Sequence, residues 1–490
     1  MLEAAWEALQ VILQAQHFMY LMLGVAVGVL VGPIPGVGGL VGMTLLLPMT
    51  YGLDPAAGLA MLVGVGAVNN TSDTFPAILM GVPGGSGSQA TIMDGYPMTQ
   101  RGEAARALSA SFIASMIGGV IGAFALTAIL PIARPLILSL GTPELLMISV
   151  LGLCTIGMLS GNRPILGLIG ALFGLLLGTI GSAPVVPEVR FTGGLDYLFD
   201  GIPLVVLAMG LFALPEMIDI LARGGAIASK TDLGNGWMEG VRDIIRHRWL
   251  VLRHSLIGAV VGAIPGLGSS LADWLNYGYV VQTAKDKSQF GKGDVRGIIA
   301  PESANNAKEG GNLIPTLLFG IPGSAGMAIL LAAMVVMGVQ PGPRMVESNL
   351  SLIFVIVWSL AIANVAATLI CVILARPIAR LTLMPFNLIF PVVFILIVLG
   401  SYQASRHVGD LIALILIGVV GWAMKRAKMP RPPLLVGFIL APLIERDLWV
   451  TSSRYGFEWL LRPGVLIIAA VILAILGTFI IRRMRKEAVQ

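Results

Sequence analysis

Long apolar runs, separated by short polar or Gly/Pro-rich stretches, follow one another along almost the whole chain of 490 residues. A helix that crosses a bilayer needs about 20 mostly apolar residues, so the chain has room for roughly ten to fourteen crossings. The pattern therefore predicts an all-α polytopic membrane protein. Helices are expected at residues 17–31, 40–50, 56–68, 107–132, 136–159, 165–182, 201–222 and 465–481.

One apolar run is too short and too broken to cross a membrane as a helix. It extends over Phe75–Val82, follows the polar segment Asn69–Thr74, and ends at Pro83–Gly85. In hydrocarbon, backbone groups that Pro and Gly leave without helical partners must be satisfied within protein or by a ligand. The run therefore predicts a re-entrant hairpin whose tip lies deep in the membrane.

A second copy of this pattern lies in the other half of the chain. Pro315 and Gly320 repeat the spacing of Pro76 and Gly81, and in both places an aliphatic residue and Pro-Gly follow. The two copies are offset by 239 residues (76 to 315). Paired Gly/Pro-interrupted apolar segments in two halves of a membrane protein indicate a transporter site.

Three further matches occur in the same order along the two halves. They are Pro35 with Pro265, Arg134 with Arg376, and Pro143 with Pro385. We therefore expect four parts. These are a first transmembrane repeat with its hairpin at 1–222, a cytoplasmic linker at 223–253, a second repeat with its hairpin at 254–462, and an extra C-terminal helix with a basic tail at 463–490.

The distribution of basic residues predicts how the repeats are oriented. Lys and Arg collect in the linker and in the C-terminal tail, which places both in the cytoplasm. An even number of crossings then separates them. Because the last helix has no counterpart in the first half, each repeat crosses an odd number of times, and the two repeats are inverted relative to each other.

Composition supports the membrane assignment and removes several classes of function. Only 12% of the residues are charged, whereas a soluble domain carries about 25%. The net charge of +5 is scattered along the chain, so nucleic acid is not an expected partner. The chain lacks the G-x-x-x-x-G-K-[ST], H-E-x-x-H and G-x-S-x-G motifs of ATP binding and of zinc or serine hydrolysis. We expect neither an enzyme nor a cofactor.

The chain after each hairpin turn is a candidate anion site. The residues are Pro83, Gly84, Gly85 and Ser86 in the first hairpin, and Pro322, Gly323 and Ser324 in the second. If a helix starts there, in mid-membrane, its N–H groups and dipole favour a carboxylate. The alternative is that each Pro-Gly only kinks a helix against its neighbour.

Amides beside the hairpins form a second group of candidates. They are Asn69, Asn70, Asn305 and Asn306. Their side chains can bind a carboxylate or a cation, but Asn is also a favoured helix cap, and both interpretations stay open. Asp94 is expected in a loop or turn, and His247 and His254 are expected to be solvated or interfacial.

A coupling ion, sodium or a proton, is the third expectation. The candidate residues are Gly36, Gly38, Asp73, Gly266, Gly268 and Glu302. An acid inside a membrane marks a functional site by default, and backbone carbonyls of unwound segments coordinate sodium in transporters. Alternatively, the acids lie in water at the interface, and the glycines permit close helix packing.

Several segments together resemble the large membrane subunit of the tripartite tricarboxylate transporter family. They are GPIPGVGG from Gly32, GVPGGSGSQATIMDGYP from Gly81, GAIPGLG from Gly262, FGKGDVRGIIAPESANNAKEGGNLIPTLLFGIPGS from Phe290, and GVQPGP from Gly338. The resemblance implies an elevator-type carrier in the bacterial inner membrane. It also implies a small membrane subunit, a periplasmic solute-binding protein and ion-driven uptake of a tri- or dicarboxylate.

Three other functions remain as alternatives. They are a passive channel, a single-component permease for small anions, and an intramembrane enzyme. A channel favours identical pore segments in an oligomer, whereas this chain has two non-identical hairpins. An intramembrane enzyme needs a cluster of nucleophile, base or metal ligands, and none stands out in the sequence.

Overall fold

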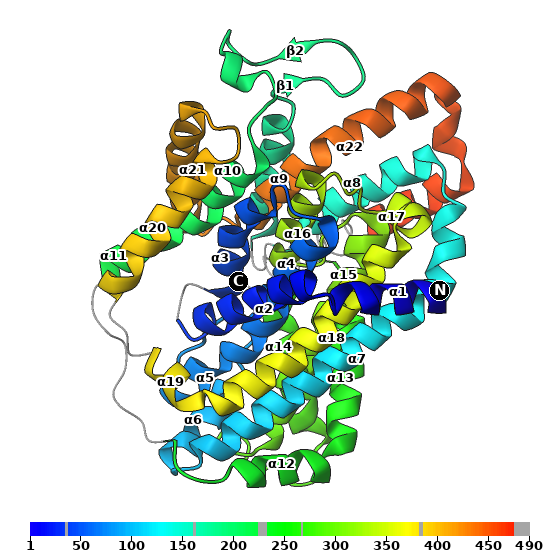
Figure 1. Cartoon of the computed structure of the whole chain (residues 1–490). Helices are drawn as coiled ribbons and strands as arrows, with labels where there is room; N and C mark the ends of the chain where they lie inside the picture. The colour runs from blue at the N-terminus through cyan, green and yellow to red at the C-terminus, as the bar shows by residue number, and fades with distance from the viewer. Residues whose placement is uncertain (35–37, 160–162, 224–232, 266–267, 382–385, 475–490) are drawn as a thin grey trace, which may run out of the picture.

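A computed structural model describes residues 1–34, 38–159, 163–223, 233–265, 268–381 and 386–474. This part of the chain is almost entirely helical (Figure 1). Its only described sheet is one small antiparallel pair, β1 (Gly181–Ser182) and β2 (Val189–Arg190), with Gly181 opposite Arg190. The expectation of an all-α membrane protein is confirmed at this level.

The helices of the first half are α1 (Leu2–Ile12), α2 (Ala15–Val31), α3 (Gly38–Leu46), α4 (Pro55–Ser72), α5 (Thr74–Met80), α6 (Ile92–Gln100), α7 (Ala104–Leu138), α8 (Thr142–Leu159), α9 (Pro164–Leu177), α10 (Leu204–Ala208) and α11 (Leu214–Arg223). Those of the second half are α12 (Trp237–Arg246), α13 (Arg248–Gly262), α14 (Gly268–Thr283), α15 (Arg296–Phe319), α16 (Ala325–Val336), α17 (Pro343–Ser348), α18 (Leu350–Ile373), α19 (Ala375–Leu381), α20 (Phe386–Tyr402), α21 (Val408–Arg426) and α22 (Pro432–Tyr455).

Few of these helices can cross a membrane unbroken. Within the described residues, three spans are long and apolar enough: Ala104–Pro135, Leu350–Ile373 and Val408–Arg426. The pair α1 and α2 adds a fourth if its 77° bend lies within one span. The other apolar helices have 10–17 residues, because Gly- and Pro-rich breaks divide the runs that the sequence shows. Any further crossing must therefore combine short or broken helices.

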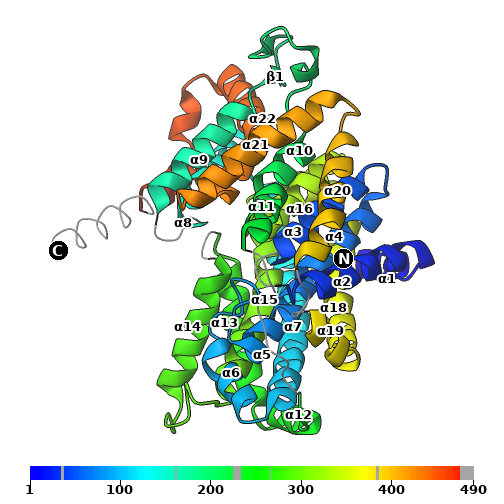
Figure 2. The ribbon, with the colours of Figure 1, turned by 90° about the vertical axis from the view of Figure 1, so that its left-hand side faces the viewer.

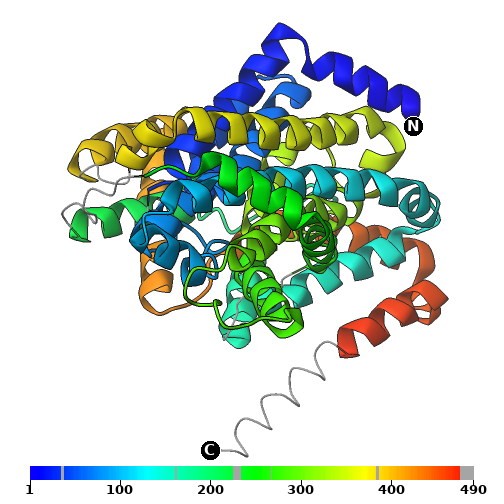
Figure 3. The ribbon, with the colours of Figure 1, turned by 90° about the horizontal axis from the view of Figure 1, so that it is seen from below.

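The centre of the molecule is a set of crossing helices from both halves. α2 packs on α4, and α13 packs on α15. The long helix α7 crosses α15, α18 crosses α4, and α7 and α18 also contact each other, as the view from below shows (Figure 3). Small residues permit these contacts, since a Cβ on Gly258 would lie 2.6 Å from the Cα of Ala304.

A second group of helices covers one end of this centre. α8 and α9 pack with α22, while α11 packs with α20 and α21 (Figure 2). The hairpin of β1 and β2 projects beyond them, and α6 and α12 lie at the opposite end (Figure 1). The first hairpin is therefore near one end of the molecule, while α16 of the second lies toward the other.

Two of the expected parts look different once folded. Within the segment expected as a linker, 223–253, the helix α12 packs against α7. Arg106 pairs with Asp243 at 2.6 Å, and Ser109 donates to the carbonyl of Trp237. Of the expected last helix, an apolar helix at Pro463–Ala474 is described, and residues 475–481 lie outside the described residues.

Candidate functional site

The two hairpins make the same turn. Gly81 ends α5 with φ +67°, and Gly320 ends α15 with φ +71°. This left-handed conformation favours glycine, which has no Cβ to clash. The next N–H then donates back to a proline carbonyl in both places, from Val82 to Pro76 and from Ile321 to Pro315. The repeated sequence spacing is therefore a repeated structure.

After the turn, each loop presses against the helix that precedes it. A Cβ on Gly84 would lie 2.8 Å from the Cα of Asp73, and a Cβ on Gly323 would lie 2.9 Å from the Cα of Asn312. Only glycine, which has no Cβ, lets the loop backbone lie this close to the preceding helix. Asp73 and Asn312, like Gly84 and Gly323, are 239 residues apart.

The two loops then diverge, which corrects one expectation. In the second hairpin, α16 begins at Ala325, and the N-cap Ser324 accepts a hydrogen bond from the N–H of Met327 at 3.4 Å. In the first, no helix starts after Pro83–Gly85, since α6 begins only at Ile92.

Side chains of the second half form hydrogen bonds with the first loop. The N–H of Ala90 donates to Asp273 at 2.6 Å, and the Thr91 hydroxyl donates to Glu302 at 2.6 Å. Asp273 thus binds a backbone N–H that an earlier helix start would have used within the helix, and Glu302 anchors the side chain that follows it. An N–H site of the helix-start type therefore exists only in the second hairpin.

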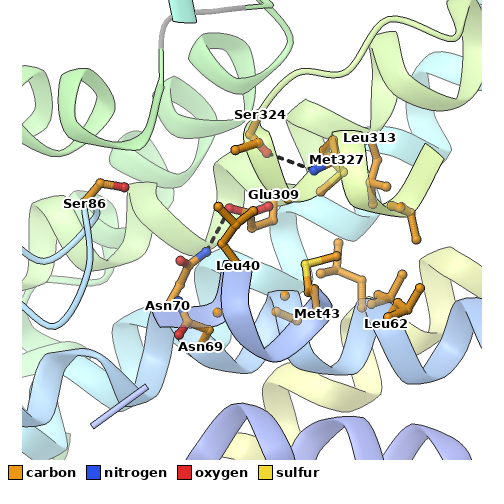
Figure 4. A pocket seen from close by; sticks show the side chains of 18 residues that line it. Leu40, Met43, Leu62, Asn69, Asn70, Ser86, Glu309, Leu313, Ser324 and Met327 are labelled. Carbon is orange, nitrogen blue, oxygen red and sulfur yellow. Dashed lines mark hydrogen bonds between the residues drawn. The ribbon is translucent and has the colours of Figure 1, made fainter. Parts of the chain in front are cut away.

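A cavity of about 200 Å³ lies between the hairpins (Figure 4). α3, α4, α15 and α16 form its walls together with the 81–91 loop. Its polar lining consists of Asn69, Asn70, Ser86, Glu309 and Ser324, and its apolar lining includes Leu40, Met43, Leu62, Leu313 and Met327. Four candidates from the sequence thus meet here: Asn69 and Asn70 before the first hairpin, Ser86 after its turn, and Ser324 of the second hairpin. Pro83, Gly84, Gly85, Asn305, Asn306, Pro322 and Gly323 are not among the lining residues.

Glu309 and Lys308 are the polar residues that sequence reasoning missed. Asn70 donates to Glu309 at 2.8 Å, and Lys308 pairs with the same carboxylate oxygen at 2.5 Å. Asn70 and Glu309 are 239 residues apart, the offset of the two hairpins. Equivalent positions of the two halves therefore touch each other. Adding the offset to Asn69-Asn70 would have pointed to the Lys-Glu pair.

The four asparagines are not helix caps, so that alternative was wrong. Asn69 and Asn70 lie within α4, and Asn305 and Asn306 lie within α15. Asn306 donates to Thr71 at 2.9 Å and to Asn364 at 2.7 Å, which joins α15 to α4 and α18. Asn305 lies against the first loop, because a Cβ on Gly87 would clash with its amide.

The two candidate acids are buried, not interfacial. Asp73 is 1% exposed and Glu302 is fully buried. Glu302 accepts hydrogen bonds from Thr91 at 2.6 Å, from Ser115 at 3.0 Å and from Thr74 at 3.2 Å. Within the described residues, neither carboxylate oxygen of Asp73 has a hydrogen-bond partner.

The candidate glycines are less well placed for a cation. Gly38 and Gly268 begin α3 and α14, where a helix presents free N–H groups and not free carbonyls. Gly36 and Gly266 lie outside the described residues. The described part of the chain contains no group of three or more His, Cys, Asp or Glu side chains that could hold a metal ion.

Two further residues differ from expectation because tertiary contacts bury them. Asp94 lies in the first turn of α6, not in a loop, and accepts hydrogen bonds from the N–H groups of Gly293 and Asp294, both at 2.9 Å. His254 is fully buried, not solvated, and its Nδ1 is 2.7 Å from the side-chain oxygen of Asn276.

The family model described as "Tripartite tricarboxylate transporter TctA family" matches residues 18–436. The chain belongs to this family. The chain is also 33% identical, over 88% of its length and 86% of the relative's, to the "Uncharacterized 52.8 kDa protein in TAR-I ttuC' 3'region" of Agrobacterium vitis. A second protein of that organism, "Uncharacterized protein in TAR-II ttuC' 3'region", is 34% identical over 39% of the chain and 79% of its own length. No solved structure matches.

Proposed function

We propose that this chain is the large transmembrane subunit of a secondary carrier that imports an organic carboxylate of the tri- or dicarboxylate type. In this proposal, a periplasmic binding protein delivers the substrate and a small membrane subunit completes the complex. A gradient of sodium ions or protons across the bacterial inner membrane drives uptake. The observation that carries the proposal is the cavity between the two hairpins, where polar residues of both halves meet.

The lining of the cavity suits an anion. Ser324, Ala325 and Gly326 bring the N-terminus of α16 to it, and the helix dipole favours negative charge at that end. Asn69, Asn70 and Ser86 add side-chain donors. Lys308 pairs with Glu309, so the one acid in the lining does not oppose a carboxylate with an uncompensated charge. The volume suits a small acid, because pockets for drug-sized ligands measure about 300–1,000 Å³.

We further propose that the two halves are inverted repeats and that the carrier works by an elevator movement. Matching turns at Gly81 and Gly320 support the repeats. So does matching packing of α2 on α4 and of α13 on α15. In this mechanism the crossing helices around the cavity move together against the group formed by α8–α11 and α20–α22.

The inverted orientation predicts that the hairpins open to opposite sides of the membrane. We expect single cysteines at Gln100 and Gln340, exposed residues near the open ends of the two hairpins, to be labelled by an impermeant thiol reagent from opposite sides. Cys154 and Cys371 are first replaced by Ser, and this cysteine-free protein serves as the unlabelled control. Labelling of both cysteines from one side only would remove the inverted-repeat proposal.

The carrier function predicts uptake that depends on partners and on a gradient. Proteoliposomes with both membrane subunits and the binding protein should accumulate a labelled carboxylate above its external concentration when an ion gradient is imposed. The large subunit alone should not. The measurement compares a panel of tri- and dicarboxylates under a sodium gradient, a pH gradient and no gradient. Non-saturable equilibration without any gradient would favour the channel, and full concentrative uptake by the large subunit alone would favour the single-component permease.

A further inference from the structure

A second polar cluster lies beside the cavity, under the 81–91 loop, and is built around Asp73. This side chain is 1% exposed. The Ser88 hydroxyl interacts with it, but neither carboxylate oxygen has a partner at hydrogen-bond distance in the described part of the chain. The loop covers it directly, since a Cβ on Gly85 would lie 2.5 Å from Oδ2 of Asp73. An unpaired carboxylate away from water is strongly unfavourable unless a cation or a proton accompanies it.

The nearest charged side chains do not supply that cation. Lys308 attracts the Asp73 carboxylate electrostatically, but its amine is already paired with Glu309. Glu302 interacts electrostatically with Asp73 as a like charge, and hydroxyl groups already bind both of its oxygens. Asp273 adds a further negative charge, and its Oδ1 has no described partner.

Asn305 completes the cluster with a neutral oxygen. It is fully buried on α15, one turn beyond Glu302, and neither atom of its amide group has a described hydrogen-bond partner. It lies against Gly87, two residues along the loop from the glycine that covers Asp73. Unpartnered oxygens of Asp73, Asp273 and Asn305 thus surround one loop.

We propose that this cluster binds one sodium ion, with the carboxylate of Asp73 and the amide oxygen of Asn305 as ligands. Carboxylate and carbonyl oxygens suit hard cations. Asp73 is the C-cap of α4, where the helix dipole favours positive charge, and it is also the N-cap of the short helix α5. A site with one coordinating carboxylate agrees with the absence, among the described residues, of a group of acids that could hold a multivalent metal.

The loop connects this ion to the carboxylate cavity. Gly84 and Gly85 lie on Asp73, and Ser86, the next residue, lines the cavity. An ion that fixes the position of the loop therefore also fixes one wall of the cavity. The inference builds on the proposed function because it assigns the coupling ion, but ion binding is measurable without transport.

The test measures sodium binding by the purified full chain in lipid nanodiscs. Thermal unfolding is followed by tryptophan fluorescence during titration with NaCl, at constant ionic strength with choline chloride, and in parallel with KCl. We expect a saturable rise of the midpoint with sodium and not with potassium. Asp73→Asn should lose this rise, and its midpoint without sodium should exceed that of the unmodified protein, because the buried charge is gone.

Asn305→Ala is the second variant, and it keeps the carboxylate. It should retain the saturable response with an apparent sodium affinity weakened about 10- to 100-fold. The control is Asp286→Asn, an exposed loop acid, which should respond like the unmodified protein.

Two results would overturn the site: no sodium-specific response of the unmodified protein, or an unchanged response of Asp73→Asn. Proton-driven carboxylate uptake without any sodium response would reject the site and keep the carrier function. An intact sodium response without carboxylate uptake would keep the sodium site and reject the carrier function.

Discussion

Gly84→Val and Gly323→Val are each expected to abolish carboxylate uptake. An added Cβ at either position meets the backbone of the preceding helix, Asp73 for Gly84 and Asn312 for Gly323, and backbone cannot turn aside as a flexible side chain can. Neither glycine has a positive φ, so the steric contact and not the backbone conformation carries the effect. Overpacking of this kind costs about 1–3 kcal/mol, and it displaces a loop next to the cavity.

The measurement is uptake in proteoliposomes, normalised to the amount of folded protein in the membrane. Gly278→Val is the matched control, because a Cβ there meets open space. Ser324→Ala should have a milder effect. It removes one hydroxyl, worth about 0.5–1.5 kcal/mol, or roughly two- to tenfold in substrate affinity. Near-normal uptake by both valine variants would show that the hairpin loops pack the structure and that the substrate binds elsewhere.

Lys308→Met is expected to destabilise the protein by about 3–5 kcal/mol, because it leaves the buried carboxylate of Glu309 without its cation. The side chain of Lys308 is 2% exposed and that of Glu309 is 12% exposed, so the little water that reaches Glu309 from the cavity compensates only in part for the lost partner. The double variant Lys308→Met/Glu309→Gln removes both charges and should recover most of the loss. In the double variant Asn70 can still donate to the amide oxygen of the new side chain.

Equilibrium unfolding in mixed micelles measures this difference. Arg101→Met provides the control, since Arg101 pairs with Glu103 at the surface, with side chains 45% and 33% exposed, and otherwise donates one exposed hydrogen bond to the carbonyl of Gly293. Such surface pairs contribute about 0–1 kcal/mol. A loss for Lys308→Met no larger than that of the control, or no recovery in the double variant, would contradict a buried ion pair at this position.

In the hairpins, the local sequence pattern predicts the turn but not the start of the next helix. The spacing of Pro76 and Gly81 recurs at Pro315 and Gly320, and the structure makes the same left-handed turn at both glycines. A glycine that follows an apolar run and precedes Pro-Gly can be recognised from sequence, because the turn depends on these few residues. The start of the next helix cannot be recognised in the same way. It differs between the two hairpins because Asp273 and Glu302, far away in sequence, bind the first loop.

By itself, then, the sequence determined the class of the protein, the two hairpins and their offset, and the resemblance that the family match confirms. These properties depend on apolar content and on the spacing of nearby residues, which do not require knowledge of the tertiary structure. The tertiary structure alone decided which polar residues meet. Nothing in the local pattern singled out Lys308-Glu309, and its importance became visible only because α4 brings Asn70 against Glu309. The Asp73 carboxylate is isolated only because the loop covers it, since burial and hydrogen bonding come from segments distant in the chain.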